Sequence, residues 1–121
     1  MNRSPHKNLE AWKVSMELVM HIYELTKTFP SEEKFGLVSQ MRRAAVSVPS
    51  NIAEGAADRT KSQFANFLST SLGSLAELDT QVELSHRLGF TNEKDYQSIS
   101  QLIDRSKGLV FGLRKSLRNK N

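Results

Sequence analysis

The stretch FGLVSQMRRAAVSVPSNIAEG, residues 35–55, decides the fold that we predict for this chain. Apolar side chains recur in it at steps of three and four residues, the period of a helix face that packs on a core. They are Val38, Met41, Ala45, Val48 and Ile52. The opposite face, which we call the signature face, carries small hydroxyl and amide side chains between an arginine and a glutamate: Arg43, Ser47, Asn51 and Glu54. An exposed helix usually fills such a face with long charged side chains, so the signature face is a candidate contact surface for another protein.

Pro49 lies inside this helical pattern. Proline lacks the backbone N–H and crowds the carbonyl four residues earlier, here that of Ala45, at a cost of about 3 kcal/mol in a helix interior. Ser47, Ser50 and Asn51 can donate side-chain hydrogen bonds to the carbonyls that the proline loosens. Because helical spacing continues on both sides, we predict a continuous helix that bends near Pro49.

Residues 39–55, SQMRRAAVSVPSNIAEG, closely resemble the signature of the four-helix bundle proteins encoded in intervening sequences of bacterial 23S rRNA genes. That family is related to the accessory variability protein of diversity-generating retroelements. Weaker similarities extend along the chain in LEAWK (9–13), TFP (28–30) and FLSTSLGSLAELDTQVELSHRLGF (67–90). The resemblance implies an up-down four-helix bundle, a ring-shaped homopentamer, a role in nucleic-acid binding and no known enzymatic activity. It also makes a reverse transcriptase a candidate partner.

Length and composition indicate a single domain. A chain of 121 residues has room for one core, so we predict one domain over residues 1–121, with a loosely ordered polar leader at 1–8. The 17 basic and 13 acidic residues give a net charge of +4, which is compatible with a polyanionic partner. The absence of cysteine excludes disulfides and thiolate metal sites. No stretch has the character of a signal peptide or a membrane span, which predicts a cytoplasmic protein without a membrane partner.

Hydrophobic spacing and capping residues predict four helices, at about 9–28, 32–57, 61–88 and from 92 onward. Ser31 is the expected N-cap of the second helix, and Thr60 with Gln63 forms a capping box for the third. Gly89 fits a left-handed C-cap, and Thr91 or Asn92 caps the fourth helix. Long helices joined by short turns place sequence neighbours antiparallel. The predicted fold class is therefore all-α, an up-down-up-down four-helix bundle.

The first helix carries two apolar stripes, more than one bundle core needs. The first stripe is Trp12, Met16, Val19 and Tyr23, and the second is Leu18, Ile22, Leu25 and Phe29. Either the helix has a broad core face, or one stripe contacts another subunit. The residues favour neither alternative, whereas the family resemblance favours a subunit contact. We predict that the second stripe forms the interface of a homo-oligomer, and the number five comes from the resemblance.

Residues that could support metal or catalytic chemistry are few. Glu83 and His86 have the Glu-x-x-His spacing of di-iron bundles, but such a site needs a second copy of the motif and two further glutamates. We therefore predict a solvated Glu–His pair, no metal and no cofactor. No Gly-rich phosphate loop or nucleophile elbow is present, so we predict no catalytic residues and no enzyme activity. Glu77 is expected to pair with Arg42 or Arg43 on the antiparallel second helix.

Basic residues concentrate near the end of the sequence. Six of the 17 lie in the last 17 positions, with no acid among them: Arg105, Lys107, Arg114, Lys115, Arg118 and Lys120. Arg59 and Lys61 flank the turn between the second and third helices, which an up-down bundle places at the same end as the end of the fourth. A solvated helix end, whose cations suit the helix dipole, is an equally good interpretation.

From this pattern we predict binding of RNA or DNA backbone without strong sequence preference. The predicted binding residues are Arg59, Lys61, Arg105, Lys107, Arg114, Lys115 and Arg118. We expect little aromatic exposure for base stacking, hence weak selectivity. The alternative function is a structural scaffold that binds another protein through the signature face and has no nucleic-acid role.

Overall fold

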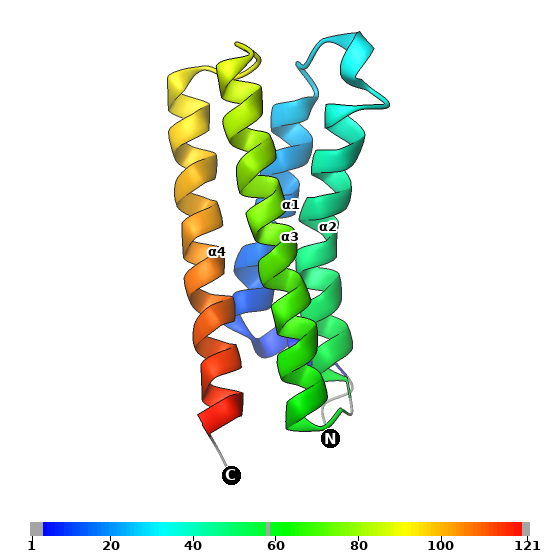
Figure 1. Cartoon of the computed structure of the whole chain (residues 1–121), viewed down its shortest axis with the longest axis vertical. Helices are drawn as coiled ribbons and strands as arrows, with labels where there is room; N and C mark the ends of the chain where they lie inside the picture. Colours follow the sequence, from blue (N-terminus) through cyan, green and yellow to red (C-terminus); the bar gives the residue numbers. More distant parts are fainter. Residues whose placement is uncertain (1–3, 58, 120–121) are drawn as a thin grey trace.

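The computed structural model describes residues 4–57 and 59–119. Within these ranges the chain forms four α-helices and two short 3-10 helices and contains no strand. The α-helices are α1 (Glu10–Thr26), α2 (Leu37–Ala56), α3 (Lys61–Arg87) and α4 (Glu93–Asn119), and the 3-10 helices are η1 (Pro5–Asn8) and η2 (Ser31–Glu33). The α-helices run up-down-up-down, so the start of α1, the α2–α3 turn and the end of α4 lie together at the lower end in Figure 1. The predicted all-α bundle is confirmed.

Each helix packs against two neighbours, α1 on α2 and α4, and α3 on α2 and α4. The largest fully buried side chains come from all four helices and include Leu18, Met41, Ile52, Leu68, Leu78 and Ile103. The five apolar residues predicted to form the inner face of the second helix are all buried. The core therefore follows the hydrophobic period of the sequence.

The second helix continues through Pro49, as predicted. The Asn51 amide Nδ2 donates to the carbonyl oxygen of Ser47 at 2.9 Å, one residue before Val48 and not to the Ala45 carbonyl that the proline leaves without its usual donor. A second donor comes from α3, since the buried Ser71 hydroxyl donates to the Val48 carbonyl oxygen at 2.9 Å. Both acceptors lie within two residues of the proline, and the Ser71 bond connects α2 to α3 there.

Gly55 allows the end of α2 to approach the start of α3 closely. A Cβ atom at this position would lie 2.7 Å from Cδ1 of Phe64 and 2.8 Å from Cβ of Phe67, closer than van der Waals contact permits. Only glycine leaves room for the Phe64 ring and the Phe67 Cβ atom to pack on the α2 backbone. The capping box of Thr60 and Gln63 then starts α3 directly after the turn, as predicted.

The predicted start of the second helix is wrong. The second helix begins at Leu37 rather than near Ser31, because residues 31–33 form η2 and the Glu33 carboxylate accepts a hydrogen bond from the Leu37 N–H at 3.2 Å. Within the leader, residues 5–8 form η1, and the His6 ring packs edge-on against Trp12 with 5.0 Å between ring centres. Residues 1–3 of the leader and Lys120 lie outside the described residues.

The predicted subunit interface on α1 is also wrong. Leu18, Ile22 and Phe29 are buried within the single chain, because this stripe faces the bundle axis and α2 and α4 flank it. The more exposed stripe is the other one, in which Met16 and Tyr23 are each 40% exposed while Trp12 and Val19 are partly buried. Both stripes are apolar, so the sequence period alone did not determine which of them faces inward.

We predict that Leu75→Ala lowers the free energy of unfolding by about 2–5 kcal/mol, because it removes a fully buried side chain and leaves a cavity. Leu84→Ala on the same helix is the matched control, because Leu84 is 48% exposed, and its effect should be small. Urea denaturation monitored by circular dichroism measures both. Equal effects of the two substitutions would contradict the assignment of Leu75 to the core.

Candidate nucleic-acid interface

Arg59 and Lys61 lie at the lower end of the bundle, on the turn that α2 and α3 share. The Arg59 Nε donates to the carbonyl oxygen of Glu54 at 3.3 Å, and its guanidinium lies 4.8 Å from the centre of the Phe67 ring. Lys61 is the first residue of α3 and is exposed. Neither of the two Arg59 contacts neutralises its charge, because the partners are a backbone carbonyl and an aromatic ring.

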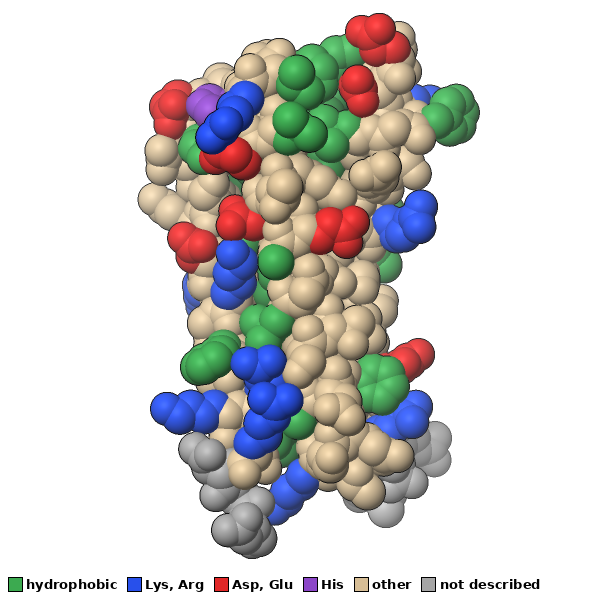
Figure 2. Space-filling view, in the orientation of Figure 1, with side chains coloured by type: hydrophobic (Ala, Val, Ile, Leu, Met, Phe, Trp, Pro, Cys, Tyr) green, Lys and Arg blue, Asp and Glu red, His purple; other side chains and the backbone are tan. Residues whose placement is uncertain are grey.

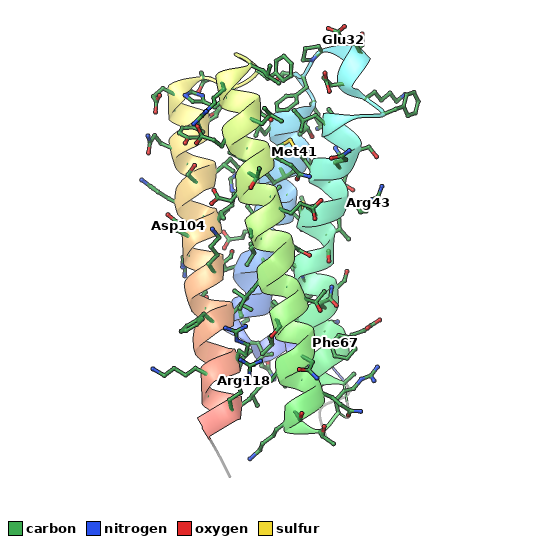
Figure 3. The ribbon with its side chains drawn as sticks, in the orientation of Figure 1. Glu32, Met41, Arg43, Phe67, Asp104 and Arg118 are labelled. Carbon is green, nitrogen blue, oxygen red and sulfur yellow. The ribbon has the colours of Figure 1, made fainter. Side chains whose placement is uncertain are left out.

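Arg114 and Arg118 reach from α4 to the same side chain on α3. The Ser69 hydroxyl oxygen accepts from Arg114 Nη1 at 3.2 Å and from Arg118 Nη2 at 3.4 Å. Figure 3 shows Arg118 lying between the lower parts of the two helices. One neutral oxygen therefore holds two guanidinium groups close together, which concentrates positive charge without compensating it.

Lys115 extends the same group, since it lies beside Arg114 and is exposed. A shallow hollow of about 350 Å³ separates the first turns of α3 from the last turns of α4, and Lys61, Asn66 and Arg118 are among the residues that line it. Figure 2 shows Lys and Arg side chains gathered over the lower half of this face and Asp and Glu mainly over the upper half.

Arg105 and Lys107, which the sequence places in the same interface, lie higher on α4 and have acidic partners. Lys107 Nζ is 2.9 Å from Oδ2 of Asp79, and Arg105 Nη2 is 3.7 Å from Oε1 of Glu10. The other five predicted residues have no carboxylate partner in the part of the chain that the structure describes. We call these five the basic end: Arg59, Lys61, Arg114, Lys115 and Arg118.

An aromatic side chain accompanies the basic end. Phe111 lies one helical turn before Arg114, is 51% exposed, and has its ring centre 5.3 Å from the Arg114 guanidinium carbon. The expectation of little aromatic exposure is therefore wrong at this position. Phe111 directly follows Val110, which is fully buried, and adjacent helical positions point in different directions, so this register was the available signal for its exposure.

The signature face does not form one open surface. The Ser47 hydroxyl oxygen accepts from Ser74 Oγ on α3 at 2.8 Å and from Asn51 Nδ2 at 3.0 Å, so Ser47 and Asn51 belong to the packed α2–α3 contact. Arg43 and Glu54 are exposed at the two ends of the face, and Figure 3 shows Arg43 directed away from the bundle. Much of the predicted docking surface is thus engaged within the chain.

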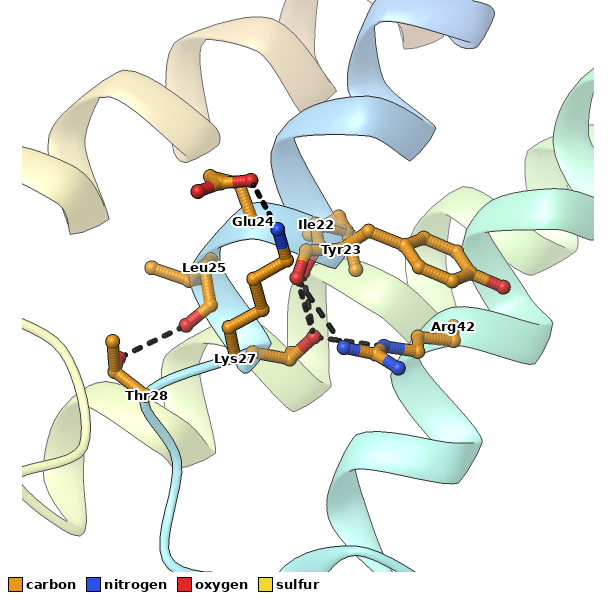
Figure 4. Close-up of polar contacts among 8 residues, drawn as sticks. Ile22, Tyr23, Glu24, Leu25, Lys27, Thr28 and Arg42 are labelled. Carbon is orange, nitrogen blue, oxygen red and sulfur yellow. Dashed lines mark hydrogen bonds and ion pairs between the residues drawn. The ribbon is translucent and has the colours of Figure 1, made fainter.

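The predicted ion pair between Glu77 and an arginine of α2 is wrong. Arg42 faces α1 instead, where its Nε donates to Thr26 Oγ1 at 3.0 Å and its Nη2 to the Tyr23 carbonyl oxygen at 3.3 Å (Figure 4). The guanidinium also lies 4.5 Å from the Tyr23 ring centre. A cation at the carboxyl end of α1 complements the helix dipole, so Arg42 has a structural role. Glu77 accepts a hydrogen bond from Gln81 of its own helix.

Glu83 and His86 form part of a junction that holds the α3–α4 turn. Glu83 accepts hydrogen bonds from the Tyr96 hydroxyl and from Arg87 Nε, and the His86 ring stacks on Tyr96 at 4.0 Å with 9° between the planes. His86 Nε2 lies 3.3 Å from Oε1 of Glu93. Among the described residues no group of three histidine or carboxylate side chains could hold a metal ion.

The same junction shifts two pKa values. The hydrogen bond from Tyr96, and after it the one from Arg87, lowers the pKa of Glu83 below its ordinary value of 4.5. The hydrogen bond to Glu83 raises the pKa of Tyr96 above its ordinary value of 10.0. The hydrogen bond between the neutral Tyr96 phenol and the ionised Glu83 carboxylate is thus favoured at pH values between the pKa of Glu83 and the pKa of Tyr96.

Comparison with known proteins agrees with this fold. The model of the family described as 23S rRNA-intervening sequence protein matches residues 7–112. The chain belongs to this family. No curated protein sequence matches the chain.

Among solved structures, the chain is similar to a protein of unknown function from the S23 ribosomal protein family of Bacteroides thetaiotaomicron. The TM-score is 0.80 and the sequence identity 25%, and the similarity covers 87% of this chain and 95% of that one. The resemblance identified from residues 39–55 is confirmed. None of the described helices combines the length and apolarity that crossing a membrane requires.

We predict that Tyr96→Phe raises the pKa of Glu83 toward 4.5, because it removes the largest cause of the shift. A group whose pKa is lowered by folding stabilises the fold above its unfolded pKa, and this stabilisation is lost as the pH falls through the folded pKa. The variant should therefore be less stable than the wild type at neutral pH, and the difference should vanish in acid. Carboxyl NMR titration measures the pKa, with Tyr23→Phe as the control. An unchanged Glu83 titration would contradict the hydrogen bond.

Proposed function

We propose that this protein binds the phosphate backbone of RNA or DNA through the basic end. The observation that supports the proposal most strongly is the contrast along α4. Arg105 and Lys107 have carboxylate partners, whereas Arg114 and Arg118 are held together on one serine oxygen. Guanidinium groups bind phosphate through paired charge-assisted hydrogen bonds, so a phosphate would supply the negative charge that Ser69 lacks.

The composition supports the same proposal. The chain has a net charge of +4, and phosphate contacts by Lys and Arg release condensed counterions, which drives binding at low salt. The family description also refers to 23S rRNA, which agrees with a nucleic-acid partner. We assign no catalytic role, because the polar groups that we describe act in packing, capping or charge concentration. Such a partner also agrees with the cytoplasmic location expected from the sequence.

We predict that Arg114→Glu combined with Arg118→Glu abolishes retention on immobilised RNA and duplex DNA. Wild-type affinity for duplex DNA should fall with salt at a log–log slope of about −0.9 per phosphate contact. Lys34→Glu combined with Lys94→Glu is the matched control, because it changes the net charge equally with two exposed lysines at the upper end. Wild-type protein that is not retained on either polymer at low salt would refute the proposal, as would equal losses in the two variants.

We further propose that copies of the chain associate through the face shared by α1 and α2. An apolar groove of about 310 Å³ lies there, lined chiefly by Trp12, Met16, Val19, Val46, Pro49 and Ala53. Met16 and Val46 are each 40% exposed, and Tyr23, which is also 40% exposed, continues the apolar surface upward. Monomeric proteins rarely leave so continuous an apolar surface in water, and a second copy of the same face would cover it.

This association would replace the interface first expected at Leu18 and Ile22. In a closed ring each subunit would add its basic end to one rim, so several weak phosphate contacts would act together. The number of subunits, five, is supported by the family resemblance alone.

We predict that Met16→Glu combined with Val46→Glu produces a monomer that remains helical, because both positions are partly exposed in the single chain. Light scattering measures the mass and circular dichroism the helicity. Leu88→Glu, at an exposed site near the α3–α4 turn, is the control and should keep the wild-type mass. A monomeric wild type at micromolar concentration, or a variant of unchanged mass, would contradict this interface.

A further inference from the structure

We infer that the basic end prefers single-stranded nucleic acid to duplex, and that Phe111 is the platform on which an unpaired base stacks. This inference rests on the proposed function, because it assigns the kind of nucleic acid that the same site binds. It is carried by the position of one open aromatic ring among cations that have no carboxylate partner within residues 4–57 and 59–119.

Phe111 differs from the other aromatic residues at the lower end. Trp12, Phe64 and Phe67 are half-buried, and the Phe67 side chain packs against the backbone of Gly55. Of the aromatic residues that the structure describes at this end, Phe111 is the one whose ring is mainly open to solvent. A single exposed apolar side chain is ordinary, so its meaning depends on what surrounds it.

The surroundings are those of a nucleotide site. Phe111, Arg114, Lys115 and Arg118 follow at i, i+3, i+4 and i+7, which places them on one side of α4. They extend over about 10 Å of helix axis, or about three phosphates at the spacing of a stacked strand. Arg114 connects the two functions, since its guanidinium lies 5.3 Å from the Phe111 ring centre and also contacts Ser69.

The hydrogen bonds to Ser69 fix the direction of the two arginine side chains. Because the hydroxyl oxygen accepts from both Arg114 and Arg118, the two long side chains lie across the α3–α4 contact. They leave the outer side of α4 to Phe111 and Lys115. A nucleic-acid strand that runs along α4 would therefore place its phosphates near these cations and one of its bases against the Phe111 ring.

Single strands and duplexes differ in whether a base can stack on the Phe111 ring. The bases of a duplex are stacked inside and reach the surface only as edges in the grooves, so a duplex contacts the basic end through phosphates alone. An unpaired base is free to stack on Phe111. Stacking of one base on an aromatic side chain changes affinity by roughly 5- to 150-fold, without dependence on sequence.

The test measures binding by fluorescence anisotropy at one low salt concentration. The probes are a short single-stranded RNA, the DNA of the same sequence, and a blunt duplex of that DNA. The variants are Phe111→Leu, which keeps an apolar side chain without a π-face, and Phe111→Trp, which keeps the ring. Phe35→Leu is the matched control, because Phe35 is 89% exposed and lies just before α2, which begins at the upper end in Figure 1.

We expect the wild type to bind both single strands more tightly than the duplex. Phe111→Leu should weaken single-strand binding by roughly 5-fold or more and leave duplex binding unchanged, whereas Phe111→Trp and Phe35→Leu should bind as the wild type does. Three results would overturn the inference and leave backbone binding intact. The wild type could bind single strands and duplex equally, the Phe111→Leu variant could bind as the wild type does, or this variant could bind all three probes more weakly by the same factor. A wild type that binds none of the probes would instead refute the proposed function itself.

Discussion

Close contact between α2 and α3 is the constraint on which the rest of this structure depends. Gly55 brings the end of α2 against Phe64 and Phe67, and the Ser71 hydroxyl reaches the Val48 carbonyl oxygen beside Pro49. The proline removes one hydrogen bond within α2, whereas the buried Ser71 hydroxyl adds one between α3 and α2 close to it. The same contact fixes the α2–α3 turn, and therefore the places of Arg59 and Lys61 at the lower end.

Charge is distributed unevenly along the bundle, and the pattern follows from how each charge is paired. Near the upper end Glu83 is bound by both Tyr96 and Arg87, and His86 lies against Glu93. Midway along α4 the cations contact carboxylates. At the lower end neutral groups hold the cations, namely Ser69, a backbone carbonyl and aromatic rings. Concentrated like charge raises the local potential, which favours a polyanion over a neutral partner.

Much of this fold could be predicted from the sequence, because helical period and capping residues are local signals. The inner face of α2, the box at Thr60 and the cap at Gly89 are of this kind. Three features depend on how helices rotate against each other, which the period does not specify. These are the burial of the Ile22 stripe, the contact of Arg42 with α1, and the enclosure of Ser47 by Ser74. The basic end could be located from the order of the helices. Lys107 does not belong to it because Asp79 of α3 pairs with Lys107, and no local signal in the sequence indicated that pair or the contacts of Ser69.

The central claim is that the lower end of the bundle is the surface that meets nucleic acid. Titration of ¹⁵N-labelled protein with a short single-stranded RNA at low salt tests this claim most directly, since amide shifts report each residue separately. Our account predicts the largest shift changes at residues 59–69 and 111–118, and little change at the α3–α4 turn. Largest changes on the signature face or on the α1–α2 groove, or no saturable change anywhere, would contradict it.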